Sequence, residues 1–487
     1  MALSVATGRF TVPGSAGLQS ITGVGFQPKA LIFFGTENQA LGTRDDLASF
    51  IGFAASATER SVMAREHDNA VTSGEPTNDN RDDRCCFLRH HITTGGGAIN
   101  YGADFDSFDA DGFTLDWITP TGEADIVFYI AIGGDDLTDV SVGQFTKKTS
   151  IGTDAITGVG FQPDVILIMG EFGTVLNASS VGGSFFMGCG TGPTSRWVTH
   201  GFDEDGVPNM DTGGNQRTDK IIIQTDDGGS LTADADLDSL DADGFTLDYI
   251  TADGNANQYS YLALKGGSYD VGSFNGNTSI GNQAVTGVGF LPIMEIFRSY
   301  CFAASASQVD NMKSLIGAGI SSSERSSHWW GSEDSVAVSD TSMELEELFC
   351  LRVRTDPDPL LASADFVSQD DSDGFTVDWD TVDAISREIL YLAMADAPKV
   401  ALPSPALATW TVLSPTVTLG VTLTPTPAVA TWAVAGPANV SLGVTLIQMP
   451  AVARWIVASP SVTVQPRGIG GDMILDDIIE KTIVVPD

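Results

Sequence analysis

Two hydrophobic patterns recur through residues 1–398, and both predict β-strands. Residues 113–117 alternate Phe, Leu and Trp with Thr and Asp, which is the two-residue period of a strand with one buried and one solvated face. Residues 30–34 and 165–169 are wholly apolar and follow Gly and Pro, a pattern typical of buried strands. Turn signals separate these stretches, and long runs with the period of a helix are absent. The pattern predicts an all-β fold.

The same strand pattern occurs three times. The motif Ile-Thr-Gly-Val-Gly-Phe-Gln-Pro at 21–28 returns at 156–163 and, as Val-Thr-Gly-Val-Gly-Phe-Leu-Pro, at 285–292. A Gly-x-Phe precedes each copy, and the block Asp-Gly-Phe-Thr follows it at 111–114, 243–246 and 373–376. Such a repeat predicts one structural unit per copy.

We therefore expect three tandem domains at 1–138, 139–269 and 270–398. Their short alternating strands and frequent turns are typical of antiparallel β-sandwiches, of jelly-roll type. The short connections at 135–142 and 268–271 favour close packing of neighbours. They leave open whether the three domains form a row or close into a pseudo-threefold ring.

The chain changes character at residues 399–466. Between residues 403 and 464 there is one charged residue, Arg454, and a Pro-Ala-x-Ala-x-Trp repeat places Trp410, Trp432 and Trp455 at spacings of 22 and 23 residues. A segment this apolar and β-prone favours aggregation when exposed, so we expect oligomerisation or attachment to a partner. A small sandwich of its own, punctuated by proline, is the alternative.

Residues 467–487 are predicted to be a docking tail with a short terminal helix over 472–481. Asp472 suits the N-cap, and Ile474, Leu475, Ile478 and Ile479 share one helical face.

Composition narrows the classes of function. The chain has 487 residues, 63 acidic against 24 basic, and a formal charge of −39. This charge argues against a nucleic-acid partner, which requires clustered Lys and Arg. No apolar run is long enough for a membrane span, and no secretory signal is visible. The odd number of cysteines, five, without a Cys-x-x-Cys pair, predicts reduced and buried thiols.

A loop that follows each motif is the first candidate binding site. It carries an Arg 34 or 35 residues after the motif Phe, then a His, and in two repeats Trp. Arg and Trp are frequent at binding hot spots, and aromatic rings suit sugars. The alternative is an internal ion pair that recurs because the fold recurs. The candidate residues are Arg60, His67, Arg196, Trp197, His200, Arg325, His328, Trp329 and Trp330.

The Asp-rich turn before each Phe-Thr strand is the second candidate, as a calcium site. Calcium takes six to eight oxygen ligands, but the pattern is not that of an EF-hand. An Asp-Gly turn with capping carboxylates is the alternative. The candidate ligands are Asp106, Asp109, Asp111, Asp238, Asp241, Asp243, Asp371 and Asp373.

Catalytic patterns are weaker. No Gly-x-Ser-x-Gly nucleophile elbow accompanies the histidines. His90 and His91 near Cys85 and Cys86 lack metal-ligand spacing and are absent from the other repeats. We therefore expect no enzyme, and no cofactor apart from the candidate calcium.

The repeat resembles a known family. Gly-x-Phe, Thr-Gly-Val-Gly-Phe-Gln-Pro and Asp-Gly-Phe-Thr-Leu-Asp-Trp together resemble repeats of tailed-bacteriophage structural proteins. The Pro-Ala-Val-Ala-Thr-Trp segment is similar to C-terminal segments of phage minor tail and fibre-like proteins. The third repeat departs from the motif at Leu291. The resemblance implies no catalytic residues.

It implies a non-enzymatic virion structural protein of a tailed bacteriophage, associated with the tail or its fibres, that contacts the host surface through the Arg, His and Trp loops. Two alternatives stay open: a capsid decoration protein at a threefold or pseudo-threefold point, and a carbohydrate-binding or carbohydrate-cleaving adhesin. The expected partners are other virion proteins, further copies of the chain and a host glycan, without nucleic acid or membrane. The expected location is the virion, after assembly in the host cytoplasm.

Overall fold

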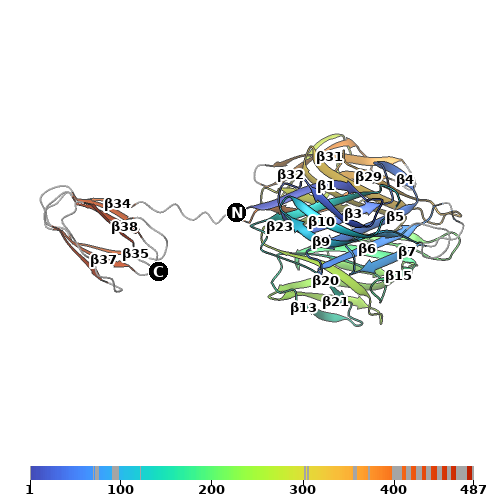
Figure 1. Ribbon diagram of the computed structural model, residues 1–487, viewed down its shortest axis with the longest axis horizontal. Coiled ribbons are helices and arrows are strands. Elements are labelled where there is room, and N and C mark those ends of the chain that lie inside the picture. Colours follow the sequence, from blue (N-terminus) through green and yellow to red (C-terminus); the bar gives the residue numbers. More distant parts are fainter. Residues whose placement is uncertain are drawn as a thin grey trace. The chain divides into compact units, whose positions relative to one another are not determined.

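The computed structural model describes residues 2–397 apart from 70, 72–75, 90–97, 121, 301–302, 304–305, 355–358 and 371–372, and it describes seven strands of residues 398–487. His90, His91, Cys301 and Asp371 therefore lie outside the described residues. The chain divides into two units, Met1–Pro398 and Lys399–Asp487 (Figure 1). All described elements are strands, which confirms the predicted all-β class.

The first unit holds three repeats of eleven strands each. The first repeat contains β1 (Leu3–Thr11), β2 (Gly17–Thr22), β3 (Pro28–Thr36), β4 (Gly42–Asp45), β5 (Leu47–Ala54), β6 (Arg60–His67), β7 (Thr77–Arg81), β8 (Cys86–Arg89), β9 (Ile99–Asp109), β10 (Gly112–Thr119) and β11 (Ile126–Gly134). The second contains β12 (Asp139–Thr146), β13 (Gly152–Thr157), β14 (Val165–Glu171), β15 (Ala178–Val181), β16 (Gly183–Gly192), β17 (Ser195–Asp203), β18 (Thr212–Arg217), β19 (Ile222–Thr225), β20 (Leu231–Asp241), β21 (Gly244–Ala252) and β22 (Gln258–Lys265). The third contains β23 (Ser268–Asn275), β24 (Gly281–Thr286), β25 (Met294–Ser299), β26 (Ala306–Asp310), β27 (Met312–Ser321), β28 (Glu324–Ser332), β29 (Thr341–Glu346), β30 (Leu351–Arg354), β31 (Leu360–Asp370), β32 (Gly374–Thr381) and β33 (Glu388–Ala395).

Each repeat is a sandwich of a seven-stranded and a four-stranded antiparallel sheet. In the second repeat the small sheet has the order β13-β21-β20-β19, and the large sheet has the order β12-β22-β14-β16-β17-β18-β26. Ile166 and Ile168 of the large sheet pack with Phe245 and Leu247 of the small sheet in one buried cluster. The predicted antiparallel sandwich is therefore confirmed, and the same two sheets recur in the other repeats.

The large sheets are buried on both faces. On β14, Ile166 and Ile168 face the sandwich core, whereas Val165, Leu167 and Met169 belong to a second cluster that includes residues of all three repeats. A strand buried on both sides needs no polar face, which explains why residues 165–169 are a continuous apolar run. The second cluster combines the common interior of the three repeats with the sandwich core of the first repeat.

The last strand of each large sheet is donated by a neighbouring repeat. β15 of the second repeat pairs with β7 of the first, β26 of the third pairs with β18 of the second, and β4 of the first pairs with β29 of the third. Figure 1 shows β4 beside β29 and β15 beside β7. The donations run in one direction and return to their start, so the three repeats form a closed ring rather than a row.

The two sequence blocks of each repeat meet in space. In the second repeat, Asp243 accepts hydrogen bonds from the backbone N–H groups of Gly158 (3.2 Å) and Gly160 (2.7 Å). Both glycines have positive φ, 87° and 91°, a backbone conformation that residues other than glycine rarely adopt. Asp111 and Asp373 make the equivalent contacts to Gly25 and Gly289. The Thr-Gly-Val-Gly motif is therefore a turn whose N–H groups are capped by the Asp-Gly block.

The second unit contains two sheets of parallel strands. β34 (Ala408–Val412), β36 (Ala430–Val434) and β38 (Val452–Val457) form one, with β40 (Glu480–Val484) antiparallel at its edge; β35 (Thr418–Leu423), β37 (Val440–Leu446) and β39 (Val462–Arg467) form the other. The register aligns Trp410, Trp432 and Trp455, so each sequence repeat supplies one strand to each sheet. This agrees with a small two-sheet unit. The predicted helix over 472–481 lies outside the described residues except for Glu480 and Lys481, which begin β40.

Candidate functional site

The junctions between repeats are the candidate functional site, because they close the ring. At each junction one residue of positive φ links the donated strand to the next strand of its own repeat: Asp46 (76°), Gly182 (91°) and Asn311 (64°). Its backbone N–H donates to a carbonyl of the accepting repeat, from Asp46 to Thr341 (3.0 Å), from Gly182 to Pro76 (2.7 Å) and from Asn311 to Thr212 (2.9 Å). The same bond thus recurs at all three junctions.

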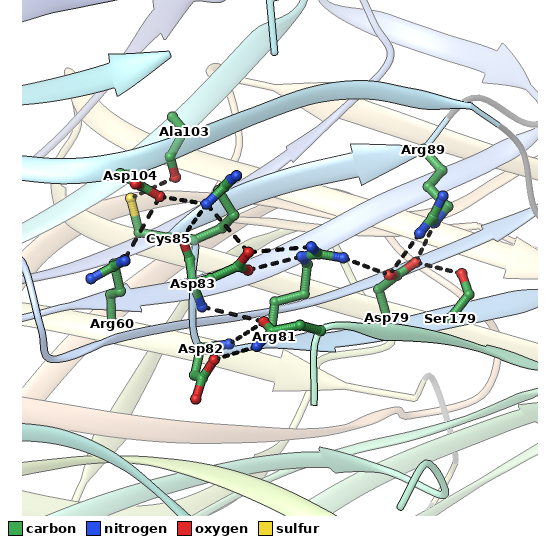
Figure 2. Close-up of polar contacts among 12 residues, drawn as sticks. Arg60, Asp79, Arg81, Asp82, Asp83, Cys85, Arg89, Ala103, Asp104 and Ser179 are labelled. Atoms are coloured by element: carbon green, nitrogen blue, oxygen red, sulfur yellow. Dashed lines mark hydrogen bonds and ion pairs between the residues drawn. The ribbon is translucent and has the colours of Figure 1, made fainter. Parts of the chain in front are cut away.

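Side chains reinforce the junction between the first and second repeats. Figure 2 shows the polar contacts around it, with Asp79 of β7 near Ser179 of β15. The Ser179 hydroxyl donates to Asp79 (3.0 Å), and the Asn177 amide donates to Asp82 (2.6 Å). The backbone of Asn177 also donates to the Asn80 carbonyl (2.9 Å). The donated strand is therefore held by both backbone and side chains.

An ion-pair chain extends from this junction across the first repeat. Arg89 pairs with Asp79 (2.6 Å), and Arg81 lies between Asp79 (3.3 Å) and Asp83 (3.0 Å) (Figure 2). Arg84 pairs with Asp83 (3.3 Å). The Arg81 guanidinium also lies 4.3 Å from the centroid of the Phe87 ring. The ion-pair chain uses basic residues, which are scarce in this acidic protein.

The recurrent arginines form internal ion pairs, as the alternative prediction proposed. Arg196 pairs with Asp236 (3.2 Å) and Arg325 pairs with Asp365 (3.2 Å), each on the adjoining small sheet of its own repeat. Arg60 lies 3.8 Å from Asp104, the equivalent aspartate of the first repeat. These arginines join the two sheets of a sandwich, so they are not presented to a partner as the binding hypothesis required.

The three histidines do not occupy equivalent positions, which corrects the prediction of a repeated Arg and His loop. In the equivalent strand pairs, His67 lies opposite Leu47, Asp203 opposite Gly183 and Ser332 opposite Met312. The position of His67 is therefore taken by Asp203 in the second repeat and by Ser332 in the third. His328 stacks against Phe34 of another repeat, and His200 lies inside its own sandwich. All three are buried.

The tryptophans are buried as well. Trp197 donates its indole N–H to the Tyr391 carbonyl (2.9 Å) across the junction of the second and third repeats. Trp329 lies in the sandwich core of the third repeat and Trp330 in the common interior. The hypothesis of an exposed aromatic platform for sugars is wrong for these residues, because each is at most 2% exposed.

One arrangement resembles a nucleophile and its base. Ser184 Oγ lies 3.0 Å from His200 Nε2, and Asn215 Nδ2 lies 3.3 Å from His200 Nδ1. Ser184 also contacts the Thr225 carbonyl (2.8 Å), and both Ser184 and His200 are fully buried. Burial lowers the pKa of His200 to about 3. A substrate cannot reach this serine, so the contacts serve packing.

Two buried glutamates make the stability of residues 1–398 sensitive to pH. Burial raises the pKa of Glu66 and of Glu171 to about 8, and Glu171 accepts a hydrogen bond from Ser180 of the donated strand β15 (3.4 Å). Because the folded state prefers the protonated forms, their contribution to stability is complete below the unfolded pKa of 4.5 and is lost as pH rises towards 8.

We expect the free energy of unfolding of the ring to fall by about 1 kcal/mol or more between pH 5.5 and pH 8.5. Glu171→Gln keeps a neutral side chain at both pH values and will reduce this fall, whereas Glu204→Gln at a half-buried site serves as the control. Urea titration at the two pH values measures the effect. An unchanged pH dependence in Glu171→Gln would contradict the assignment.

The candidate calcium ligands serve as caps and turn residues. Besides Asp111, Asp243 and Asp373, which cap the motif turn, Asp109 and Asp241 accept hydrogen bonds from Thr114 (2.7 Å) and Thr246 (2.6 Å). Asp106 and Asp238 are exposed, and Asp371 lies outside the described residues. Within the described ranges no three His, Cys, Asp or Glu residues are grouped to hold a metal ion. The geometry supports the turn alternative.

We expect Asp243→Ala to lower the free energy of unfolding by about 1 kcal/mol, since two backbone N–H groups lose a charged acceptor at an exposed site. A chelator will leave the melting temperature of the parent protein unchanged. Asp238→Ala, at an exposed position of the preceding strand β20, is the matched control. A melting temperature that chelation lowers would restore the calcium hypothesis.

The described cysteines fit the predicted reduced and buried thiols. Cys85, Cys86, Cys189 and Cys350 are free and buried. Cys85 and Cys350 contact the Ala103 and Ala364 carbonyls (3.5 and 3.3 Å), and burial raises the pKa of Cys350. A thiol held in this way suits packing rather than metal ligation.

A surface groove of about 360 Å³ lies between the third and first repeats. Its lining includes Thr7 and Phe128 of the first repeat with Ser323, Glu324 and Leu348 of the third. Glu324 accepts a hydrogen bond from the backbone of Thr7 (3.0 Å), so part of the polar lining already closes the junction. Sequence reasoning missed this groove because its two walls belong to different repeats, and Thr7 and Glu324, which meet there, are 317 residues apart in the chain.

Comparison with known proteins assigns the chain to no family. No protein-family model matches the chain, and no curated protein matches it. Among the described residues, no helix has the length and apolar character that crossing a bilayer requires.

Proposed function

We propose that the chain is a non-enzymatic structural protein of a tailed-bacteriophage virion, associated with the tail or its fibres. In this proposal residues 1–398 form a rigid body and residues 399–487 attach it. The observation that carries the proposal is the cyclic strand exchange, in which one chain builds a body of three equivalent repeats. Such a body complements a partner of threefold symmetry without assembling three chains.

The chemistry of the interior supports a structural role. The polar groups that sequence analysis selected are used in ion pairs, caps and packing, and Ser184, which lies beside His200, is buried. The repeat motif, which resembles that of phage structural proteins, supplies the turn that holds each sandwich.

The composition of the second unit supports the attachment role. The outermost strands β34 and β35 carry no charged residue, and charges are the usual protection of a sheet edge against further pairing. An uncharged edge suits strand pairing with another virion protein or with a further copy of the chain.

A capsid decoration protein is the second candidate, because three equivalent repeats around one axis also match a capsid threefold point. The adhesin alternative loses its aromatic platform, since Trp197, Trp329 and Trp330 are buried, and retains the 360 Å³ groove as a surface for host glycans. Copy number distinguishes the tail protein from the decoration protein: a handful of copies per virion supports the tail, and tens to hundreds support decoration.

Deletion of residues 399–487 tests the proposal. The truncated chain will melt like the body of the full chain but will be absent from particles, as quantified by mass spectrometry of purified virions. Incorporation at the normal level by a folded truncation would overturn the attachment role. A chain bearing an exposed tag at the same terminus controls for steric effects, and the same measurement gives the copy number.

A further inference from the structure

A small cavity lies where the three repeats meet. It has a volume of about 10 Å³, and its lining includes Ser49 and Arg65 of the first repeat, Phe185 of the second and Trp330 of the third. Arg65 and Trp330 stand at equivalent positions, opposite Ser49 and Ser314 in the matching strand pairs. The cavity therefore lies in the common interior, and every repeat contributes to its wall.

Two side chains that line this cavity, Arg65 and Trp330, carry N–H donors. Arg65 donates one N–H to Asp203, while its Nε and Nη1 atoms have no partner in the described part of the chain. The indole Nε1 of Trp330 also has none there. The side chain of Arg65 is 3% exposed and Trp330 is 2% exposed, so solvent does not satisfy these donors. The lining includes no carboxylate.

The charges near the cavity also favour an anion. A second buried guanidinium, Arg298, donates to the Thr199 hydroxyl (2.8 Å) and lies 5.4 Å from the centroid of the Trp330 ring. No carboxylate pairs with Arg298 among the described residues, whereas Arg65 pairs with Asp203. Burial lowers the pKa of Arg298 to about 10, so it stays charged at neutral pH. Burial also lowers the pKa of His328 to about 3, and this neighbour stays neutral. Of these two buried guanidinium groups, only that of Arg65 has a carboxylate partner among the described residues.

We propose that this cavity binds one monovalent, monatomic anion of the size of chloride, which locks the three repeats together. A monatomic anion accepts hydrogen bonds from Arg65 and Trp330 and, unlike water, has no O–H group that needs an acceptor. Its negative charge compensates the guanidinium of Arg298. The cavity has room for one small species only, which excludes sulfate, phosphate and carboxylates. The bound ion touches all three repeats, so it stabilises the closed ring and not the separate sandwiches.

Thermal unfolding of the full chain in sodium chloride and in sodium gluconate, at equal ionic strength, tests this proposal. We expect the melting temperature to rise with chloride in a saturable way that gluconate does not reproduce. Trp330→Phe removes one N–H donor and keeps the ring, so the chloride concentration at half-saturation will rise by about tenfold. Trp117→Phe is the matched control, because it also removes an indole N–H but one that donates to Gln19 (2.8 Å) in the small sheet of the first repeat, away from the cavity lining.

Crystals grown in bromide give a readout that does not depend on the variants. An anomalous peak between Arg65, Phe185 and Trp330 is the expected result. A melting temperature that responds equally to both salts, together with no anomalous peak, would overturn the proposal and assign the cavity to a water molecule.

Discussion

Gly182→Val will lower the free energy of unfolding of residues 1–398 by at least about 2 kcal/mol. Gly182 has a φ of 91°, which a β-branched residue does not adopt without strain, and a Cβ there would lie 2.8 Å from the Asp227 Cβ. The residue links the donated strand β15 to β16, and its N–H bonds the Pro76 carbonyl of the first repeat. Chemical denaturation followed by Trp fluorescence measures the loss.

Gly254→Val is the matched control, since an added Cβ at Gly254 meets nothing within 4 Å and its φ is not in the left-handed region. We expect it to change stability by less than about 0.5 kcal/mol. Asp46→Val and Asn311→Val test the equivalent positions of the other two junctions and will destabilise as Gly182→Val does. Equal stability of the Gly182 and Gly254 variants would contradict the role of the junction.

Asp203→Ala will lower the free energy of unfolding by about 3–5 kcal/mol. Asp203 is fully buried and pairs with Arg65 and His67 of another repeat, so its removal leaves a buried guanidinium without a carboxylate. The free energy of unfolding from urea titration measures the cost.

Asp236→Ala is the control for this pair, because Asp236 is partly exposed and its ion pair with Arg196 lies within one repeat. We expect a cost of up to about 1 kcal/mol there. The double variant Arg65→Met with Asp203→Ala will recover much of the loss, since both buried charges are gone. A double variant no more stable than Asp203→Ala would show that the pair is not the cause.

The fold of one repeat was predictable because local patterns define it. The alternation at 113–117 and the apolar run at 165–169 correspond to β10 and β14. The exchanged strands were not predictable in the same way. β4, β15 and β26 are only four or five residues long, and each pairs with residues of another repeat, so no local period indicates them.

The candidate site was predictable only in part. Spacing located Arg60, Arg196 and Arg325 at equivalent positions, and these residues form the predicted alternative, ion pairs within a sandwich. Spacing failed for the histidines, because a shift of one residue along a strand moves a side chain to the opposite face. Thus His200 faces a sandwich core, while His67 and His328 face the common interior.

A disulfide between residues 7 and 326 tests the closed ring most directly. Thr7 of the first repeat and Ser326 of the third lie with their hydroxyl oxygens 3.3 Å apart, and the four described native cysteines are free and buried. In the double variant Thr7→Cys with Ser326→Cys, we expect an intramolecular disulfide to form in air, detected by peptide mapping under non-reducing conditions. The single variants are the controls. Two thiols that remain reduced and react independently with maleimide, as in a row of three separate domains, would contradict the ring.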